Sequence, residues 1–248
     1  MDDSFAYVVG ANMKLKCLTL ERIIDAAYFC GIDGTPVSLI LVAPPGTGKT
    51  WATSALAQTD FVVYLNTVYS PNEHRKLIAN AAPRMKLLIN DDLALAAGWR
   101  PEEFFGTLCM VHDGTLQFTM YKTVEHATTK CSIILCSTTS YYYKHRDTLQ
   151  AMGFLDRFMP VVIELSQETR RKYQKYEQQT SIFDDSPISR NPEFIDIKSV
   201  KSDLLSRKNL NVRWLRGLRR ISQYFTEEET AEFIDLVHAN EKNERYEI

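Results

Sequence analysis

A glycine-containing loop with a lysine and a threonine is the part of the sequence whose residue types point most clearly to chemistry. It lies in the stretch SLILVAPPGTGKTWAT, residues 38–53, between an apolar β-prone run and a run of good helix formers. At such a strand-to-helix junction, consecutive backbone N–H groups and the helix N-terminus attract phosphate oxygens. Lys49 would reach the β- and γ-phosphates, and the Thr50 hydroxyl would ligate Mg²⁺. The predicted nucleotide-binding residues are Ala43, Pro44, Pro45, Gly46, Thr47, Gly48, Lys49, Thr50 and Trp51.

The first position of this loop departs from the usual pattern G-x-x-x-x-G-K-[ST]. Ala43 stands where that pattern has glycine. Because a Cβ atom penalises positive φ, we expect a slightly altered loop geometry. An ordinary glycine turn is the alternative interpretation, and the strand-to-helix context favours the phosphate loop.

Two adjacent acids form the second chemical signal. Asp91 and Asp92 follow the apolar run at residues 85–89, downstream of the loop. Ligands of open α/β sheets bind at the carboxyl ends of strands, where these acids would lie. Asp91 would hold Mg²⁺ through water, and Asp92 would polarise an attacking water. The alternative is a solvated turn that happens to carry two acids.

Composition sets limits on the class of protein. The chain has 248 residues, 45% of them hydrophobic and 24% charged, as in ordinary globular domains. The net charge of −2 means that any nucleic-acid contact must come from local basic patches. The five cysteines form no C-x-x-C pair and are odd in number, so we expect a reducing, cytoplasmic setting. The five histidines lack metal-ligand spacing. No apolar run approaches the roughly 20 residues of a membrane span, and the acidic start is not a signal peptide.

Apolar runs that alternate with helical patterns predict the fold class. The predicted strands are continuously apolar rather than alternating, which is typical of a parallel sheet covered by helices on both faces. We therefore expect an α/β fold with a parallel sheet between helices. The predicted strands lie at 37–42, 61–66, 85–89, 131–136 and 161–165, and the predicted helices at 18–30, 49–57, 70–82, 101–111, 141–152 and 167–178, with a hairpin at 115–128.

Changes in composition divide the chain. Residues 1–17 are an ambiguous N-terminal segment, and residues 18–180 form the predicted nucleotide-binding core. A polar stretch at 181–197 is interpreted as a linker, and residues 198–248 as a small helical unit.

The loop and the acid pair together resemble the AAA+ ATPase family. The motif APPGTGKT differs from that family's GPPGTGKT only at Ala43, and Asp92 replaces the usual second acid, glutamate. The resemblance implies an αβα core with a C-terminal helical lid, and hydrolysis of ATP with Mg²⁺. Asp92 is one methylene shorter than glutamate, so we expect slow hydrolysis.

Three further stretches resemble family elements around the nucleotide. CSIILCSTTS is similar to the sensor 1 strand, which makes Thr139 the first candidate and Thr138 the second. GFLDRF resembles the segment that gives an arginine finger to a neighbouring subunit, so Arg157 is the candidate; a surface pair with Asp156 is the alternative. NLNVRWLRGLRRI resembles sensor 2 with Arg213, and a basic amphipathic helix without nucleotide contact is the alternative.

An arginine finger that acts on a neighbouring subunit implies self-assembly into a ring, often of six subunits in this family, or into a helical oligomer.

The predicted hairpin resembles the pore hairpins of helicase-like and MoxR-like branches of the family. Its Tyr121, Lys122 and His126 are candidate contacts to DNA or to a threaded polypeptide, or simply face solvent. A basic cluster is the other candidate DNA surface, although charged helices are usually only solvated. It comprises Lys198, Lys201, Arg207, Lys208, Arg213, Arg216, Arg219 and Arg220.

Three functions follow from the resemblance and stay open. The first, which we rank highest without inferring motor activity, is an ATPase coupled to DNA in replication, recombination or a mobile element. The second is a MoxR-like protein remodeller. The third is an ATP-dependent assembly switch or loader with little turnover, recruited by a protein partner, which Asp92 and the compact size favour.

Overall fold

A five-stranded parallel sheet forms the centre of the molecule. The computed structural model describes residues 18–65, 70–98, 101–120, 123–163 and 212–242. All the neighbouring strand pairs run parallel, in the order β2-β3-β6-β1-β7. The prediction of a parallel sheet is therefore confirmed. The strands are β1 (Ser38–Val42), β2 (Val62–Leu65), β3 (Leu87–Asn90), β6 (Ser132–Ser137) and β7 (Met159–Val162).

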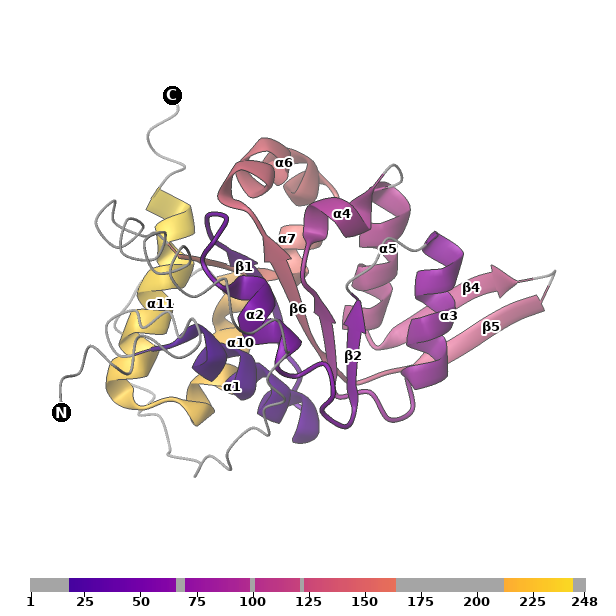
Figure 1. Ribbon diagram of the computed structural model, residues 1–248, viewed down its shortest axis with the longest axis horizontal. Coiled ribbons are helices and arrows are strands. Elements are labelled where there is room, and N and C mark those ends of the chain that lie inside the picture. The colour runs from indigo at the N-terminus through magenta and orange to yellow at the C-terminus, as the bar shows by residue number, and fades with distance from the viewer. Residues whose placement is uncertain (1–17, 66–69, 99–100, 121–122, 164–211, 243–248) are drawn as a thin grey trace, which may run out of the picture.

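Helices cover both faces of this sheet (Figure 1). Side chains of β1 alternate between two buried clusters: Leu39 and Leu41 join one, and Ile40 and Val42 join the other. A strand buried on both sides needs apolar residues at every position, which explains the continuous runs in the sequence. The helices are α1 (Leu20–Ile32), α2 (Lys49–Ser54), α3 (Pro71–Ala81), α4 (Leu93–Ala97), α5 (Pro101–His112), α6 (Thr139–Ala151), α7 (Phe154–Arg157), α10 (Val212–Ile221) and α11 (Glu227–Lys242), with the 3₁₀ turn η1 (Ser222–Tyr224).

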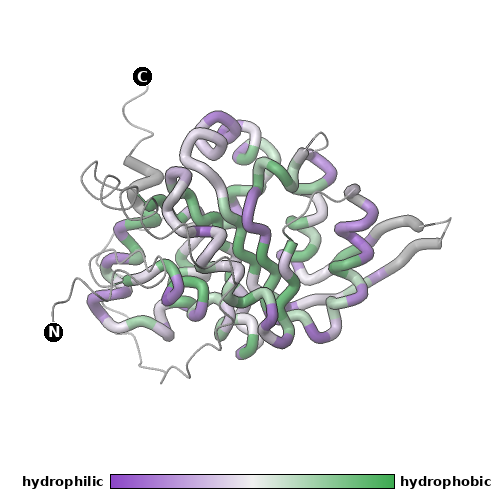
Figure 2. Tube along the Cα trace, in the orientation of Figure 1, coloured by the Kyte–Doolittle hydropathy of each residue, from purple (hydrophilic) through white to green (hydrophobic). Residues whose placement is uncertain are grey.

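The colouring by hydropathy follows the same layers. Figure 2 shows the hydrophobic segments gathered in the middle of the molecule and the hydrophilic ones toward its outside. Within the described part of the chain, no helix is both long and apolar enough to cross a membrane.

Local capping explains where two helices begin. The Thr19 side chain accepts a hydrogen bond from the Arg22 N–H at the start of α1. Ser70 and Glu73 form a reciprocal capping box at the start of α3, and Pro71 occupies its first turn. These residues satisfy N–H groups that have no partner within the helix.

A hairpin of β4 (Thr115–Met120) and β5 (Thr123–Thr128) extends from the body of the molecule (Figure 1). Gly114, at a φ of 85°, makes the turn into β4, a conformation that favours glycine. His126 is exposed on this hairpin, whereas Tyr121 and Lys122 lie outside the described residues.

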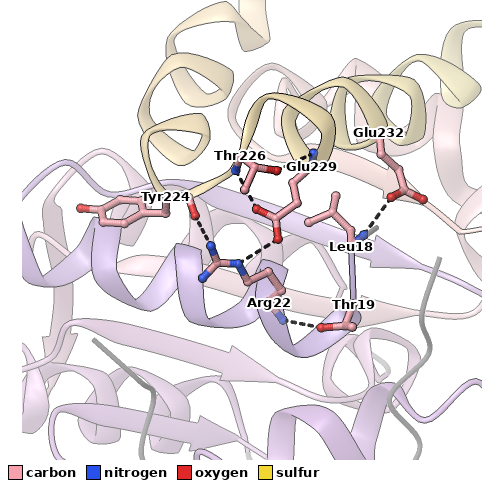
Figure 3. Close-up of polar contacts among 7 residues, drawn as sticks. All are labelled: Leu18, Thr19, Arg22, Tyr224, Thr226, Glu229 and Glu232. Carbon is pink, nitrogen blue, oxygen red and sulfur yellow. Dashed lines mark hydrogen bonds and ion pairs between the residues drawn. The ribbon is translucent and has the colours of Figure 1, made fainter. Parts of the chain in front are cut away.

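The C-terminal helices pack directly on the sheet-bearing core. Trp214, Leu218 and Phe233 belong to the same buried cluster as Leu39 of β1. Figure 3 shows Arg22 of α1 at this junction, donating to Glu229 and to the Tyr224 carbonyl. The predicted helix at 167–178, the linker at 181–197 and the boundary at 198 lie outside the described residues, so the domain division stays a prediction.

Candidate nucleotide-binding site

The phosphate-loop sequence adopts a tight turn between β1 and α2. Gly46 and Gly48 have φ values of 74° and 75°, in the left-handed region that only glycine enters readily. Ala43 is fully buried, and its N–H donates to the Ser137 carbonyl at 3.2 Å. Phe61 is the one described residue other than glycine with positive φ. The backbone penalty expected at Ala43 is therefore absent, because Ala43 does not need positive φ.

A cavity of about 280 Å³ lies over this loop and joins it to the two acids. Strand β6 sits between β1 and β3, so the loop after β1, the acids after β3 and the polar end of β6 meet at one edge of the sheet. The lining residues are Pro45, Gly46, Thr47, Gly48, Lys49, Thr50, Trp51, Asp91, Asp92, Cys136, Ser137 and Thr138.

Lys49 is held in place by the loop itself. Its Nζ donates to the carbonyl oxygens of Ala43 at 2.8 Å and Pro44 at 2.9 Å, and to Thr47 Oγ1 at 3.2 Å. The side chain is only 8% exposed, and burial lowers its pKa, while the charge of Asp92 acts in the opposite direction. The geometry fixes a cation beside the backbone N–H groups of the turn, as phosphate binding requires.

Asp91 is linked to the phosphate-loop helix through a tyrosine. The Tyr64 hydroxyl donates to Asp91 Oδ2 at 3.2 Å and lies 3.3 Å from Thr53 Oγ1 on α2. Burial raises the pKa of Asp91, and the hydrogen bond from Tyr64 counteracts that rise. The sequence prediction missed Tyr64, although a hydroxyl near the end of the strand beside the acid-bearing strand is the signal that would have found it.

Asp92 caps helix α4. Its Oδ1 accepts hydrogen bonds from the N–H groups of Ala94 at 2.9 Å and Leu95 at 3.1 Å. This is the standard role of an aspartate at a helix N-cap. The carboxylate that faces the cavity is therefore already engaged in local structure.

The polar end of β6 brings Thr138, rather than Thr139, to the cavity. Thr138 lines the cavity and caps α6 by accepting from the Tyr141 N–H at 3.2 Å. Thr139 is the first residue of α6 and is not among the lining residues. Cys136 also lines the cavity, and burial raises its pKa to about 12, so it remains a neutral thiol.

Arg157 lies near the amino ends of the parallel strands, whereas the phosphate loop lies at their carboxyl ends. The arginine lies two residues before β7, which runs parallel to β1 with Met159 beside Leu39. Its guanidinium forms a two-pronged ion pair with Asp113, Nε to Oδ1 at 3.0 Å and Nη2 to Oδ2 at 3.0 Å. The alternative suggested by the sequence was a surface pair with Asp156; the ion pair that the structure gives Arg157 is with Asp113.

Helix α10, which carries Arg213, also lies near the amino ends of the strands. Trp214 Nε1 donates to the Leu155 carbonyl at 2.9 Å, and Arg220 Nη1 donates to the Pro36 carbonyl just before β1 at 2.8 Å. The side chain of Arg213 lies outside the described residues. The structure thus does not bring helix α10 to the phosphate loop of its own chain.

The donor set at the cavity fits a magnesium ion. The Thr50 hydroxyl and the Asp91 carboxylate both line it, and Mg²⁺ prefers oxygen ligands while retaining several waters. Elsewhere too, the described residues contain no cluster of three or more His, Cys, Asp or Glu able to hold a metal. A site of this kind would thus rely on one carboxylate, one hydroxyl and the substrate's own phosphates.

Comparison with known proteins leaves the geometry as the basis for assigning a function. The sequence matches no protein-family model, and no curated protein matches it. The functional assignment therefore depends on the residues and distances described above.

Proposed function

We propose that the protein binds ATP with Mg²⁺ in the cavity over the phosphate loop and hydrolyses it as an oligomeric AAA+ ATPase. One observation carries the proposal: the glycine loop, Lys49, Asp91 and Asp92 line a single cavity at the carboxyl edge of a parallel sheet. Ligands of open α/β sheets bind at that edge, and a loop of this type binds phosphate.

Each lining residue has a role in this reaction. The backbone N–H groups of the loop and Lys49 bind the β- and γ-phosphates. Thr50 and Asp91 hold the magnesium ion, which when bound neutralises charge on the phosphate oxygens. Asp92 accepts a hydrogen bond from the attacking water and orients it, and Thr138 faces the same space. We assign the sensor role to Thr138 in place of Thr139.

Oligomerisation completes the site. Arg157 is separated from its own loop by the length of β1 and stands on the opposite edge of the sheet. A guanidinium there can stabilise charge on a γ-phosphate only in a neighbouring subunit. A ring, with six subunits as the family expectation, or a helical filament places each Arg157 at the next subunit's cavity.

We propose that ATP hydrolysis is coupled to action on DNA. A protein remodeller is the competing class of function. The exposed His126 on the projecting hairpin supports contact with nucleic acid, since an imidazole can stack on a base or hydrogen-bond to a phosphate oxygen. The capping bonds of Asp92 favour a third class, a slow assembly switch, because they occupy one oxygen of the acid that must orient water.

ATP turnover, measured with oligomer mass, tests the proposal. The assay runs without additive and with single-stranded DNA, duplex DNA or an unfolded protein. DNA stimulation supports the first class, polypeptide stimulation the second, and ATP-dependent assembly with negligible turnover the third.

The variant Lys49→Ala tests the site itself. It should lose nucleotide binding because the cavity loses its cation, whereas Lys144→Ala, an exposed lysine on α6, should bind as wild type does. Binding is measured with a fluorescent ATP analogue. Tight binding by Lys49→Ala would contradict the phosphate-loop assignment.

A further inference from the structure

A second cavity lies at the amino ends of the parallel strands, and we name it the amino-edge cavity. Its volume is about 320 Å³. Three guanidinium groups line it, from Arg157, Arg216 and Arg220, against one lining carboxylate, Asp156. His112 also lines it, but burial lowers the pKa of that imidazole and keeps it neutral at pH 7. The arginines therefore supply the positive charge of this cavity, chiefly Arg216 and Arg220, because the ion pair with Asp113 offsets the charge of Arg157.

This cavity is remote from the nucleotide of the same chain. It opens beside Pro36 and Ser38, where the chain enters β1, whereas the phosphate loop follows the other end of that strand. β1 has five residues, and its four steps span about 13 Å. The arginines of the amino edge thus lie at the far end of β1 from the phosphate loop of their own subunit.

The arginines are mounted on rigid supports. Helix α10 is held by two hydrogen bonds: the Trp214 indole N–H donates to the Leu155 carbonyl, and Arg220 donates to the Pro36 carbonyl. Arg157 is held by Asp113. Arg216 is exposed on the same helix, and the sequence of α10 contains no acidic residue. Fixed guanidinium groups of this kind bind phosphate oxygens in a defined orientation.

The shape of the site favours a compact anion over a nucleic-acid strand. Binding of single strands uses exposed aromatic rings on which bases stack. Trp214 is the one aromatic ring other than His112 among the lining residues, and it is only 5% exposed, with its indole N–H already bonded. A short polyphosphate needs no stacking platform and carries enough negative charge to engage several guanidinium groups.

We propose that the amino-edge cavity receives the triphosphate bound to the neighbouring subunit, so that Arg216 of α10 acts in trans beside Arg157. This inference rests on the proposed ATPase function. It changes the assignment of α10: the helix that resembles sensor 2 serves the next subunit's nucleotide rather than its own. Arg220 is a positioning residue, since it ties α10 to the start of β1.

Mixing two inactive variants tests this inference. Arg216→Ala keeps an intact loop, and Lys49→Ala keeps intact arginines. Each variant alone should lose turnover, about 100- to 1000-fold for Arg216→Ala by comparison with loss of one oxyanion donor. In an equimolar mixture about one quarter of the junctions pair an intact loop with intact arginines, as head-to-tail assembly requires, and turnover should recover toward that fraction.

Arg219→Ala is the matched control, because Arg219 is exposed on the same helix but does not line the amino-edge cavity. It should keep wild-type turnover. Thermal unfolding of Arg216→Ala shows whether the variant keeps the fold. The variant Arg216→Lys retains the charge and shows whether the guanidinium itself is needed.

Several outcomes would overturn the inference. One is full turnover by Arg216→Ala, and another is no recovery in mixtures whose mass shows co-assembly. A third is loss of single-stranded DNA binding by Arg216→Ala with unchanged turnover, which would assign the arginines to nucleic acid.

Failure of the underlying ATPase proposal is distinguishable from failure of this inference. Wild-type protein that binds no ATP, or binds it independently of Lys49, contradicts both. If the wild type binds ATP but turns over too slowly to measure, the readout is ATP-dependent assembly. Arg216→Ala should then weaken assembly while isolated subunits keep wild-type Mg·ATP affinity, and unchanged assembly would overturn the inference.

Discussion

Asp92 combines two tasks in a single carboxylate. It lines the cavity over the phosphate loop, and it accepts hydrogen bonds from two N–H groups at the start of α4. An N-cap side chain typically contributes about 1 kcal/mol, and asparagine caps as well as aspartate does. The two tasks can therefore be separated by choice of substitution.

We expect Asp92→Asn to unfold at nearly the wild-type urea concentration while its turnover falls at least about 100-fold, since the amide cannot accept a proton from water. Asp92→Ala should lose turnover and also about 1 kcal/mol of unfolding free energy. Urea unfolding and steady-state turnover are the measurements. Equal stability of the two variants would show that the cap contributes nothing.

The residues found from sequence are those whose role depends on local order along the chain. Lys49, Asp91 and Asp92 follow directly from a loop and a strand end, and the structure brings them together. Tyr64 and Cys136 were missed because their place depends on which strands are neighbours. That information is tertiary and no local pattern contains it.

Helix α1 lies unusually close to the start of β3. A Cβ atom added to Gly31 would stand 1.9 Å from the Lys86 carbonyl oxygen, which is backbone and cannot move aside cheaply. By contrast, a Cβ atom at Gly106 of α5 meets nothing within 4 Å. The same substitution should therefore have opposite signs in the two helices.

We expect Gly31→Ala to destabilise the fold by about 1–3 kcal/mol through overpacking. Gly106→Ala should stabilise it by roughly 0.5–1 kcal/mol, because alanine is the better helix former. Thermal or urea unfolding measures both. A stable Gly31→Ala protein would mean that α1 can shift away from β3 at little cost.

At the level of elements, continuous apolar runs were enough to predict five parallel strands. The spatial order β2-β3-β6-β1-β7 was not predictable from them, because any two buried parallel strands satisfy the same pattern. The start of α6 at Thr139 rather than Tyr141 was missed because Thr138 caps the helix earlier than periodicity suggests. This shift moves Thr139 into the helix and leaves Thr138 at the cavity.

Across the whole molecule, Arg22 joins the first described helix to the last. It donates to Glu229 Oε1 at 3.2 Å and to the Tyr224 carbonyl at 2.8 Å, and both members of the ion pair are largely buried. Glu229 in turn accepts a hydrogen bond from the N–H of Thr226, the residue just before α11 (Figure 3). One guanidinium thus fixes both the 3₁₀ turn and the last described helix.

Arg22→Ala should lower the unfolding free energy by about 1.5–3 kcal/mol, the typical range for hydrogen bonds to charged groups. The exposed Arg84 offers a control, since Arg84→Ala should change stability by less than about 0.5 kcal/mol. Hydrogen exchange adds a local readout: amides of α11 should exchange faster in Arg22→Ala, as its docking weakens. Unchanged exchange in α11 would show that apolar burial alone holds this helix.

The hydroxyl of Tyr64, which lies between Asp91 and Thr53, links the charge state of Asp91 to the orientation of hydroxyl groups beside the cavity over the phosphate loop. Tyr64 and Thr53 each have one hydroxyl proton, while Thr53 Oγ1 lies within 3.1 Å of the carbonyl oxygens of both Lys49 and Thr50. When Asp91 is ionised, the Tyr64 proton points to it, and Thr53 is left to donate either to helix α2 or to Tyr64. The charge state at the end of β3 therefore selects among hydroxyl orientations in the first turns of the phosphate-loop helix, with no movement of the backbone.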